Sequence, residues 1–222
     1  MNKAIVLAAG ESYDTSDIFP KILLKNPITN ETIIESFLKN YGDNTLFVLG
    51  FRALSILNTH PNINVVLNHS WAITKSAYSL SLAINCLSPE EIVDIYSGDY
   101  FIEDTFFEEF KKNSSENILV ASFRESRSQK ACNLKVDQGI IQSKYNGTVE
   151  NYNDPESLGI IRTKVSNLKK WISKFPINYK SLYTTDIIPN SNLKDFDLFI
   201  EKNKIFEINN ANDFINYRSL RS

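Results

Sequence analysis

Continuous apolar runs alternate along the first half of the chain with segments in which apolar residues recur at helical spacing. The runs at 3–9, 44–51 and 63–69 show no regular polar alternation, which is typical of strands buried on both faces of a parallel sheet. The same reading predicts helices at 30–41 with Asn30 as the cap, from Arg52, at 76–87 with Ser76 as the cap, and at 104–113. Further strands are predicted at 91–101 and 116–123. Strands and helices in this alternation predict an open, doubly wound α/β sheet.

The pattern changes after residue 124. Residues 130–147 alternate apolar and polar around the sequence Asp137-Gln138-Gly139, which predicts a hairpin with a short turn. The remaining elements expected are a strand at 156–163, a helix at 165–175, and a last strand and helix within 204–220, capped at Asn209 or Asn210. No linker, repeat or low-complexity tract interrupts the sequence. We therefore expect one domain over residues 1–222, with its second half as a lid or extension.

Composition narrows the kind of partner. The 222 residues are 42% hydrophobic and 23% charged, as in ordinary globular proteins. A net charge of −2 gives no long-range field that would attract nucleic acid or an anionic membrane, so a small-molecule partner is expected. The apolar run at 4–9 is too short to span a bilayer and, with only Lys3 before it, predicts neither a signal peptide nor an anchor, so a cytoplasmic location is expected. No metal-binding or disulfide spacing is found for Cys86, Cys132, His60 and His69.

Two residues near the first strand have possible chemistry. Gly10 follows that strand directly, and without a Cβ the backbone can turn tightly and bring its N–H groups close to an anion. The same glycine also fits a plain turn. Lys21, after Pro20, could supply a positive charge to phosphates behind this loop, or could be an ordinary solvated lysine.

Later strand ends carry carboxylates. Asp99 ends a Ser-Gly-Asp turn at the carboxyl end of the strand predicted at 91–101, where an oxygen ligand could meet a divalent cation or simply favour a turn. Glu207 and Asn209 share one face of the final strand because side chains alternate with a period of two. Together with Asp99 they could hold a hard cation.

These pieces, in this order, resemble a known family. The motifs are "LAAG" (7–10), "PK" (20–21), "GD" (98–99) and "EIN" before "ANDF" (207–214), and their spacing is similar to that of nucleotidyltransferases acting on sugar phosphates and phosphocholine. The segment "NHSWAITKSAYSLSLA" (68–83) resembles small cytidylyltransferases of the phosphocholine and aminoethylphosphonate type, with a Thr, two polar residues and a Ser-Leu helix.

The resemblance implies a fold and a reaction. The fold would be a mostly parallel, Rossmann-like sheet of the nucleotide-diphospho-sugar transferase type, with a nucleotide-binding half at 1–124 and a small β-hairpin and helical acceptor-binding extension at 125–222. The reaction would be transfer of CMP from CTP to a small phosphorylated or phosphonate alcohol or amine, with release of pyrophosphate, for decoration of a surface polysaccharide or lipid. Alternatives are a sugar-1-phosphate nucleotidyltransferase using another nucleotide, and a catalytically silent nucleotide-binding or scaffold protein.

The resemblance also implies roles for individual residues. Lys21 and Asp99 would be catalytic, and Mg²⁺ would be held by Asp99, Glu207 and Asn209. The residues implied for nucleotide binding are Leu7, Ala8, Ala9, Gly10, Glu11, Ser12, Thr74, Lys75, Ser76 and Gly98.

The loop after Gly10 departs from the family pattern. Relatives usually continue with a second small residue, then Ser or Thr, and then an arginine that binds the triphosphate, whereas here the sequence is Glu11, Ser12, Tyr13, Asp14. Losing such a charge-assisted contact weakens nucleotide binding unless another group replaces it. Three explanations remain open: Asp14 and Asp17 attract a second Mg²⁺, Lys75 or Arg52 reaches the triphosphate instead, or the protein is silent.

Acceptor binding is implied for Arg124, Trp171, Tyr183 and Asp186. Aromatic residues could form a cage for a quaternary ammonium, although aromatics within helices and strands usually pack in the core; the set is Trp71, Tyr78, Tyr152, Trp171 and Tyr183. Asp186 could bind an ammonium or hydroxyl group. Arg124 and Arg127 could hold the acceptor phosphate or be solvated. A homodimer is possible, although no apolar stripe indicates one.

Overall fold

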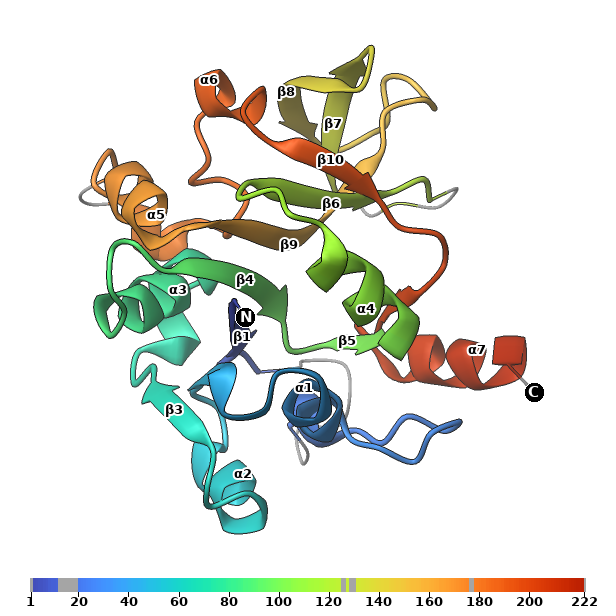
Figure 1. Cartoon of the computed structure of the whole chain (residues 1–222). Helices are drawn as coiled ribbons and strands as arrows, with labels where there is room; N and C mark the ends of the chain where they lie inside the picture. The colour runs from blue at the N-terminus through green and yellow to red at the C-terminus, as the bar shows by residue number, and fades with distance from the viewer. Residues whose placement is uncertain (1, 12–19, 125–126, 128–130, 176–177, 222) are drawn as a thin grey trace.

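Nine strands form one sheet in the computed structural model, which describes residues 2–11, 20–124, 127, 131–175 and 178–221. Their order is β3-β2-β1-β4-β9-β6-β10-β8-β7 (Figure 1). The strands are β1 (Lys3–Ala8), β2 (Thr45–Leu49), β3 (Asn64–Leu67), β4 (Ile92–Ser97), β6 (Ile118–Ser122), β7 (Cys132–Asp137), β8 (Ile140–Asn146), β9 (Glu156–Lys164) and β10 (Asp197–Ile200). A separate ladder pairs β5 (Tyr100–Ile102) with β11 (Ile205–Glu207).

The first half of the sheet has the predicted parallel arrangement. β1 pairs in parallel with β2 and β4, and β2 pairs in parallel with β3. Every residue of β2 is buried, in agreement with its uninterrupted apolar sequence. The carboxyl ends of these strands therefore meet at one edge of the sheet, which is where ligands bind in open α/β folds.

The second half differs from the prediction. β9 lies between β4 and β6 and is antiparallel to both, and the β7–β8 hairpin and the β8–β10 pairing are antiparallel too. A bridge between β7 and β9 partly closes the last five strands. Parallel pairing of β9 with β6 would need a crossover connection, usually a helix, whereas the described chain between these two strands contains only the β7–β8 hairpin. The α/β class is thus confirmed, whereas the mostly parallel, Rossmann-like sheet is wrong for this half.

Two strands were not predicted as they are observed. The strand expected at 91–101 is broken at Gly98 and Asp99, so that β4 stays in the large sheet while β5 pairs with β11. β10 was not predicted, and it pairs in parallel with β6 through residues 197–200. Its four residues are too short a segment for a period to be evident.

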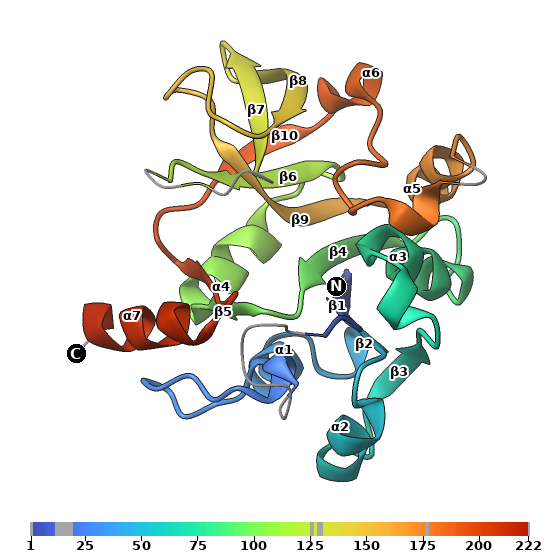
Figure 2. The same ribbon diagram turned by 180° about the vertical axis from the view of Figure 1, so that it is seen from behind.

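Helices cover both faces of the sheet (Figures 1 and 2). α1 and α4 pack against one set of alternating strand residues, which includes Val6 and Phe47, and α3 and α5 pack against the other, which includes Ile5 and Val48. The helices are α1 (Ile33–Tyr41), α2 (Ala53–Thr59), α3 (Ser76–Asn85), α4 (Asp104–Lys112), α5 (Val165–Ile172), α6 (Asn190–Leu193) and α7 (Ala211–Arg221). None of these helices in the described chain is long and apolar enough to cross a bilayer.

The helix caps follow the sequence only in part. Asn210 caps α7, because its Oδ1 accepts the Asp213 N–H at 3.1 Å. The cap of α1 is Thr32 rather than Asn30, and Thr32 forms a capping box with Glu35. Ser76, expected to cap α3, is instead the first residue of that helix.

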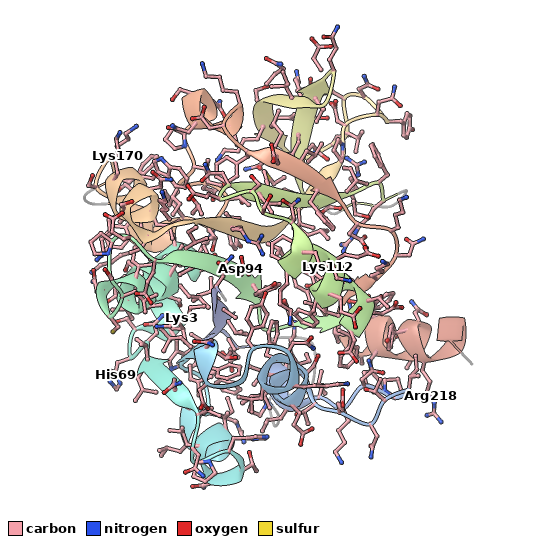
Figure 3. All side chains as sticks on the ribbon, viewed as in Figure 1. Lys3, His69, Asp94, Lys112, Lys170 and Arg218 are labelled. Atoms are coloured by element: carbon pink, nitrogen blue, oxygen red, sulfur yellow. The ribbon has the colours of Figure 1, made fainter. Side chains whose placement is uncertain are left out.

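A buried ion pair joins β4 to β9. Asp94 and Arg162 stand directly opposite each other in the antiparallel ladder, and Arg162 Nε lies 2.6 Å from Asp94 Oδ1. The Tyr41 hydroxyl donates to Asp94 Oδ2 at 2.9 Å, and Arg162 also donates to two backbone carbonyl groups at the end of α4. In Figure 3 Asp94 lies in the middle of the molecule. Because removing one partner of a buried pair leaves a charge without compensation, this pair favours the observed antiparallel register.

Candidate active site

A cavity of about 430 Å³ opens at the carboxyl ends of β1 and β4. It is lined by most of the residues predicted for nucleotide binding, namely Leu7, Ala8, Ala9, Gly10, Glu11, Thr74, Lys75, Ser76 and Gly98. Lys21, Asp99 and Tyr183 line it as well. Ser12, Tyr13, Asp14 and Asp17 lie outside the described residues. The structure therefore gathers three separated parts of the sequence, namely the first strand end, the segment at 74–76 and the Gly-Asp turn, around one space.

Close backbone packing forms the floor of this cavity. A Cβ on Gly98 would lie 2.6 Å from Ala8 Cβ, and the Gly98 N–H donates to the Leu7 carbonyl at 2.9 Å. Any side chain at position 98 would therefore push β1 and the Gly-Asp turn apart. Gly10 is different, because an added Cβ would meet no atom of the described residues within 4 Å. Gly10 thus leaves space open at the end of β1, where a ligand can approach the backbone.

A hydrogen-bond network centred on Asn68 organises one wall. Asn68, only 1% exposed, donates through Nδ2 to Thr74 Oγ1 at 3.1 Å and to Ser79 Oγ at 3.0 Å, and its Oδ1 accepts the Ser70 N–H at 2.9 Å. Thr74 in turn donates to the Ser70 carbonyl at 2.8 Å. Asn68 and Ser79 line the cavity but were not predicted as site residues. The sequence did contain one indication of a site residue here, because Asn68 directly follows β3 and so lies at the same edge of the sheet.

Lys75 occupies the same wall, next to Tyr183. Its Nζ lies 4.3 Å from the centre of the Tyr183 ring. The segment that carries Tyr183 is held to the start of α3, because the Lys75 N–H donates to the Lys180 carbonyl at 2.8 Å and the Thr184 N–H donates to Ser76 Oγ at 2.9 Å. Arg52, the other candidate for a replaced arginine contact, is not among the residues that line the cavity, and its guanidinium lies 5.4 Å from the Phe51 ring.

Asp99 lines the cavity, whereas Glu207 and Asn209 do not, although Glu207 is close enough to Asp99 to interact with it electrostatically. Glu207 is opposite Tyr100 in the β5–β11 ladder, and the Ile208 N–H donates to the Asp99 carbonyl at 2.9 Å. Burial raises the pKa of Glu207, and the negative charge of Asp99 raises it further, whereas Arg124 and a hydrogen bond from Asn209 lower it. Arg124 Nη1 lies 3.1 Å from Glu207 Oε2.

These side chains offer the oxygen donors that Mg²⁺ prefers. The Oδ1 atom of Asp99 is buried and has no hydrogen-bond partner among the described residues, which fits a carboxylate prepared to receive a cation. Two carboxylates and the amide of Asn209 make up the predicted set. Within the residues that the structure describes, no group of three or more His, Cys, Asp or Glu side chains is placed to hold a metal. A cation here would therefore also need oxygens from its substrate or from water.

Several residues predicted for the acceptor lie elsewhere. Trp171 is 3% exposed and packs in the core, 5.8 Å from Phe196 between ring centres, so it is not available to a ligand. Asp186 accepts the Tyr183 N–H at 2.8 Å and thus holds a turn. Tyr152 is 88% exposed and does not line the cavity. Of the five aromatic residues predicted for a cage, Trp71 and Tyr183 line the cavity, whereas Tyr78, Tyr152 and Trp171 do not. The five residues together therefore do not form one cage.

No family model matches the sequence, and no curated protein matches it either. Solved structures do share the fold. The CTP:phosphocholine cytidylyltransferase from Streptococcus pneumoniae is 20% identical, with 99% of each chain covered and a TM-score of 0.75. A putative glucose-1-phosphate thymidylyltransferase from Bacillus anthracis is 16% identical, with 99% of this chain and 95% of the other covered and a TM-score of 0.77.

The inositol-1-phosphate CTP transferase from T. maritima is 18% identical, with 100% of this chain and 97% of the other covered and a TM-score of 0.70. All three likenesses extend over nearly the whole length of both chains. At these identities they establish the architecture and not the substrate. The chain has the fold that these nucleotidyltransferases share.

Proposed function

We propose that the protein is a nucleotidyltransferase that transfers CMP from CTP to a small phosphorylated or phosphonate alcohol or amine and releases pyrophosphate. The observation that carries this proposal is the cavity at the carboxyl edge of the sheet. It combines an open backbone turn at Gly10, a lysine at position 21, the rim carboxylate of Asp99 and the polar wall at 74–76. A negatively charged ligand with an uncharged heterocyclic end suits such a mixture of groups.

Each side of the cavity has a distinct role in this proposal. The backbone of Ala9 and Gly10 receives phosphate oxygens, since among the described residues no atom lies within 4 Å of where a Cβ on Gly10 would be. Lys21 supplies positive charge to the phosphoryl group that is transferred. Thr74 and Ser76 contact the base and ribose, and both are fixed by the hydrogen bonds described above. Catalysis is then positioning of two anionic reactants together with stabilisation of the charge between them.

Lys75 is our candidate for the contact that the missing loop arginine would make. It lines the cavity and Arg52 does not. Its ammonium lies over the Tyr183 ring. An aromatic ring carries no net charge, so this contact orients the lysine side chain and leaves its positive charge unneutralised. A lysine binds phosphate as a point charge and not through the bidentate geometry of an arginine, so the replacement changes the contact while keeping its sign.

Asp99, Glu207 and Asn209 would hold Mg²⁺. Bound there, the cation would neutralise negative charge on the phosphate of the nucleotide. For the acceptor we propose Tyr183, at the cavity wall, and Arg124, beside Glu207. Trp171 is not proposed, because it is buried in the core.

A second candidate is transfer of a different nucleotide to a sugar 1-phosphate. The similarity to a putative glucose-1-phosphate thymidylyltransferase favours it. Pyrophosphate release distinguishes the two candidates when each of the four NTPs is combined with Mg²⁺ and with phosphocholine, aminoethylphosphonate, phosphoglycerols or sugar 1-phosphates. The proposal expects release that needs CTP and one non-sugar acceptor. Release that needs another NTP and a sugar 1-phosphate would favour the second candidate, and silence of folded protein across all combinations would favour a non-catalytic nucleotide-binding protein.

A further inference from the structure

Arg124 is placed among carboxylates and not in open solvent. It follows β6, and its Nη1 donates to Glu207 Oε2 at 3.1 Å. The two side chains are 25% and 27% exposed, so the pair is shielded but can still be reached by small ions. Arg127, three residues later, is engaged differently, because it donates to the Arg124 carbonyl and to Asn133 Oδ1.

More carboxylates surround Arg124 than the one, Glu207, to which it is hydrogen-bonded. Glu156, at the start of β9, has a pKa raised by burial, partly offset by the charge of Arg124. Its Oε2 and the Oδ1 of Asp99 are both buried and have no hydrogen-bond partner within the part of the chain that the structure describes. Asp99 and Glu156 each interact electrostatically with Glu207, and we call these three side chains the carboxylate cluster. Among the described residues Arg124 is hydrogen-bonded only to Glu207 of the three. The three are not placed to coordinate one metal ion together, so only Asp99 and Glu207 are taken as its ligands. Such a cluster favours additional positive charge.

We propose that Arg124 is a resident counter-ion of Glu207 that a divalent cation displaces, so that cation binding and release of the Arg124 guanidinium are one coupled event. This rests on the proposed function only in that Glu207 and Asp99 are taken as cation ligands. The Glu207 oxygen that accepts the hydrogen bond from Arg124 cannot keep that bond at full strength and also coordinate a cation. The guanidinium and the cation, both bound to Glu207, would also repel each other. Arg124 thus weakens cation binding until the cation takes its place.

Release from Glu207 on cation binding leaves the Arg124 guanidinium free to bind a second partner. Once released, its guanidinium remains at the edge of the carboxylate cluster, where an anionic group of the acceptor can pair with it. The acceptor would then be received after the cation is bound. Arg124 is on this account a positioning residue whose partner changes, and not a permanent structural ion pair.

Binding of Mn²⁺ alone, followed by electron paramagnetic resonance of the free ion at low salt without nucleotide, tests this proposal. We expect Arg124→Gln to bind Mn²⁺ about fivefold or more tightly than the unaltered protein, which is within the usual range of coupling between sites. Arg124→Lys, which keeps a charge, should give an intermediate affinity. Arg127→Gln is the matched control, since it removes a nearby guanidinium that does not bond Glu207, and it should change the affinity less than twofold. Adding Glu207→Gln to Arg124→Gln should abolish the gain.

Unchanged or weaker Mn²⁺ binding in Arg124→Gln would overturn the proposal, and so would an equal gain in Arg127→Gln. The absence of binding in both the unaltered protein and Arg124→Gln would also overturn it. If Arg124→Gln is not folded by circular dichroism, Arg124→Lys decides by the same criterion. Because no nucleotide is present, the result is independent of whether CTP is the substrate.

Discussion

The Ile208 N–H donates to the Asp99 carbonyl across 2.9 Å, and this bond fixes the strand that carries Glu207 against the turn that carries Asp99. The two carboxylates are far apart in the sequence, Asp99 near its middle and Glu207 near its C-terminal end, and the β5–β11 ladder brings their segments together. The backbone thus places two negative charges side by side independently of any side-chain contact between them. Such an arrangement costs electrostatic energy, which a bound cation offsets.

Asp99→Asn should abolish turnover while the protein stays folded. The substitution removes the negative charge at the rim and keeps the shape, so we expect kcat to fall by about 10²–10³-fold or more. Pyrophosphate release measures the effect, and the melting temperature reports the fold. Asp137→Asn, in the exposed turn of the β7–β8 hairpin, is the control and should leave both unchanged. Full activity in Asp99→Asn would remove Asp99 from the mechanism.

Lys75→Ala should weaken CTP binding. A charge-assisted contact to phosphate contributes about 1.5–3 kcal/mol, so the dissociation constant should rise about 10- to 100-fold. Isothermal calorimetry with CTP measures it. Arg52→Ala is the matched control, because Arg52 lies outside the cavity lining, and it should not change the affinity. If Arg52→Ala bound CTP weakly and Lys75→Ala bound it normally, Arg52 would be the residue that replaces the missing arginine contact.

Two glycine substitutions should separate folding from binding. Gly98→Ala forces a Cβ to within 2.6 Å of Ala8 Cβ, so we expect a loss of about 1–3 kcal/mol in the free energy of unfolding. Gly10→Ala meets no atom within 4 Å in the described part of the chain and should change stability by less than about 0.5 kcal/mol. Its methyl group should nevertheless reduce CTP affinity, since it enters space meant for the ligand. Denaturant unfolding measures the stability of both variants, and calorimetry measures their affinity for CTP. Equal losses of stability in Gly98→Ala and Gly10→Ala would contradict this account.

The buried pair of Asp94 and Arg162 should be strongly coupled. Arg162→Met leaves Asp94 without its counter-charge at 0% exposure, so we expect a loss of about 3–5 kcal/mol of stability. The double variant Asp94→Asn/Arg162→Met should lose less than the sum of the two single variants, because it contains no uncompensated charge. Urea unfolding of the four proteins completes the cycle. Strict additivity would mean that the pair contributes no specific interaction.

The sequence predicts the site edge well because parallel strands place their carboxyl ends together. Gly10 and Asp99 each follow a strand of the parallel half, so their meeting follows from the α/β alternation. The segment at 74–76 was expected beside them only from the family resemblance. The direction of β9 was not predictable in this way, since no residue pattern records which neighbour a strand pairs with. Asn68 was missed because its role depends on hydrogen bonds to Thr74 and Ser79, which only the folded backbone brings within reach.

Trp171 illustrates a different limit. An aromatic residue in an amphipathic helix has the same sequence signature whether it faces a ligand or the core, and here it faces the core. The contact between Arg124 and Glu207 likewise joins distant segments whose sequences contain no sign of each other. Charges and aromatic rings therefore became informative only once the sheet had fixed their positions.

The most direct test of nucleotidyl transfer follows the individual phosphates of CTP. CTP labelled on the α-phosphorus and CTP labelled on the γ-phosphorus are incubated separately with the protein, Mg²⁺ and the accepted phospho- or phosphono-substrate. We predict that the α label appears in a CMP-linked acceptor product and the γ label in pyrophosphate. Release of the γ label as inorganic phosphate, or an acceptor that carries the γ label, would contradict the proposed reaction.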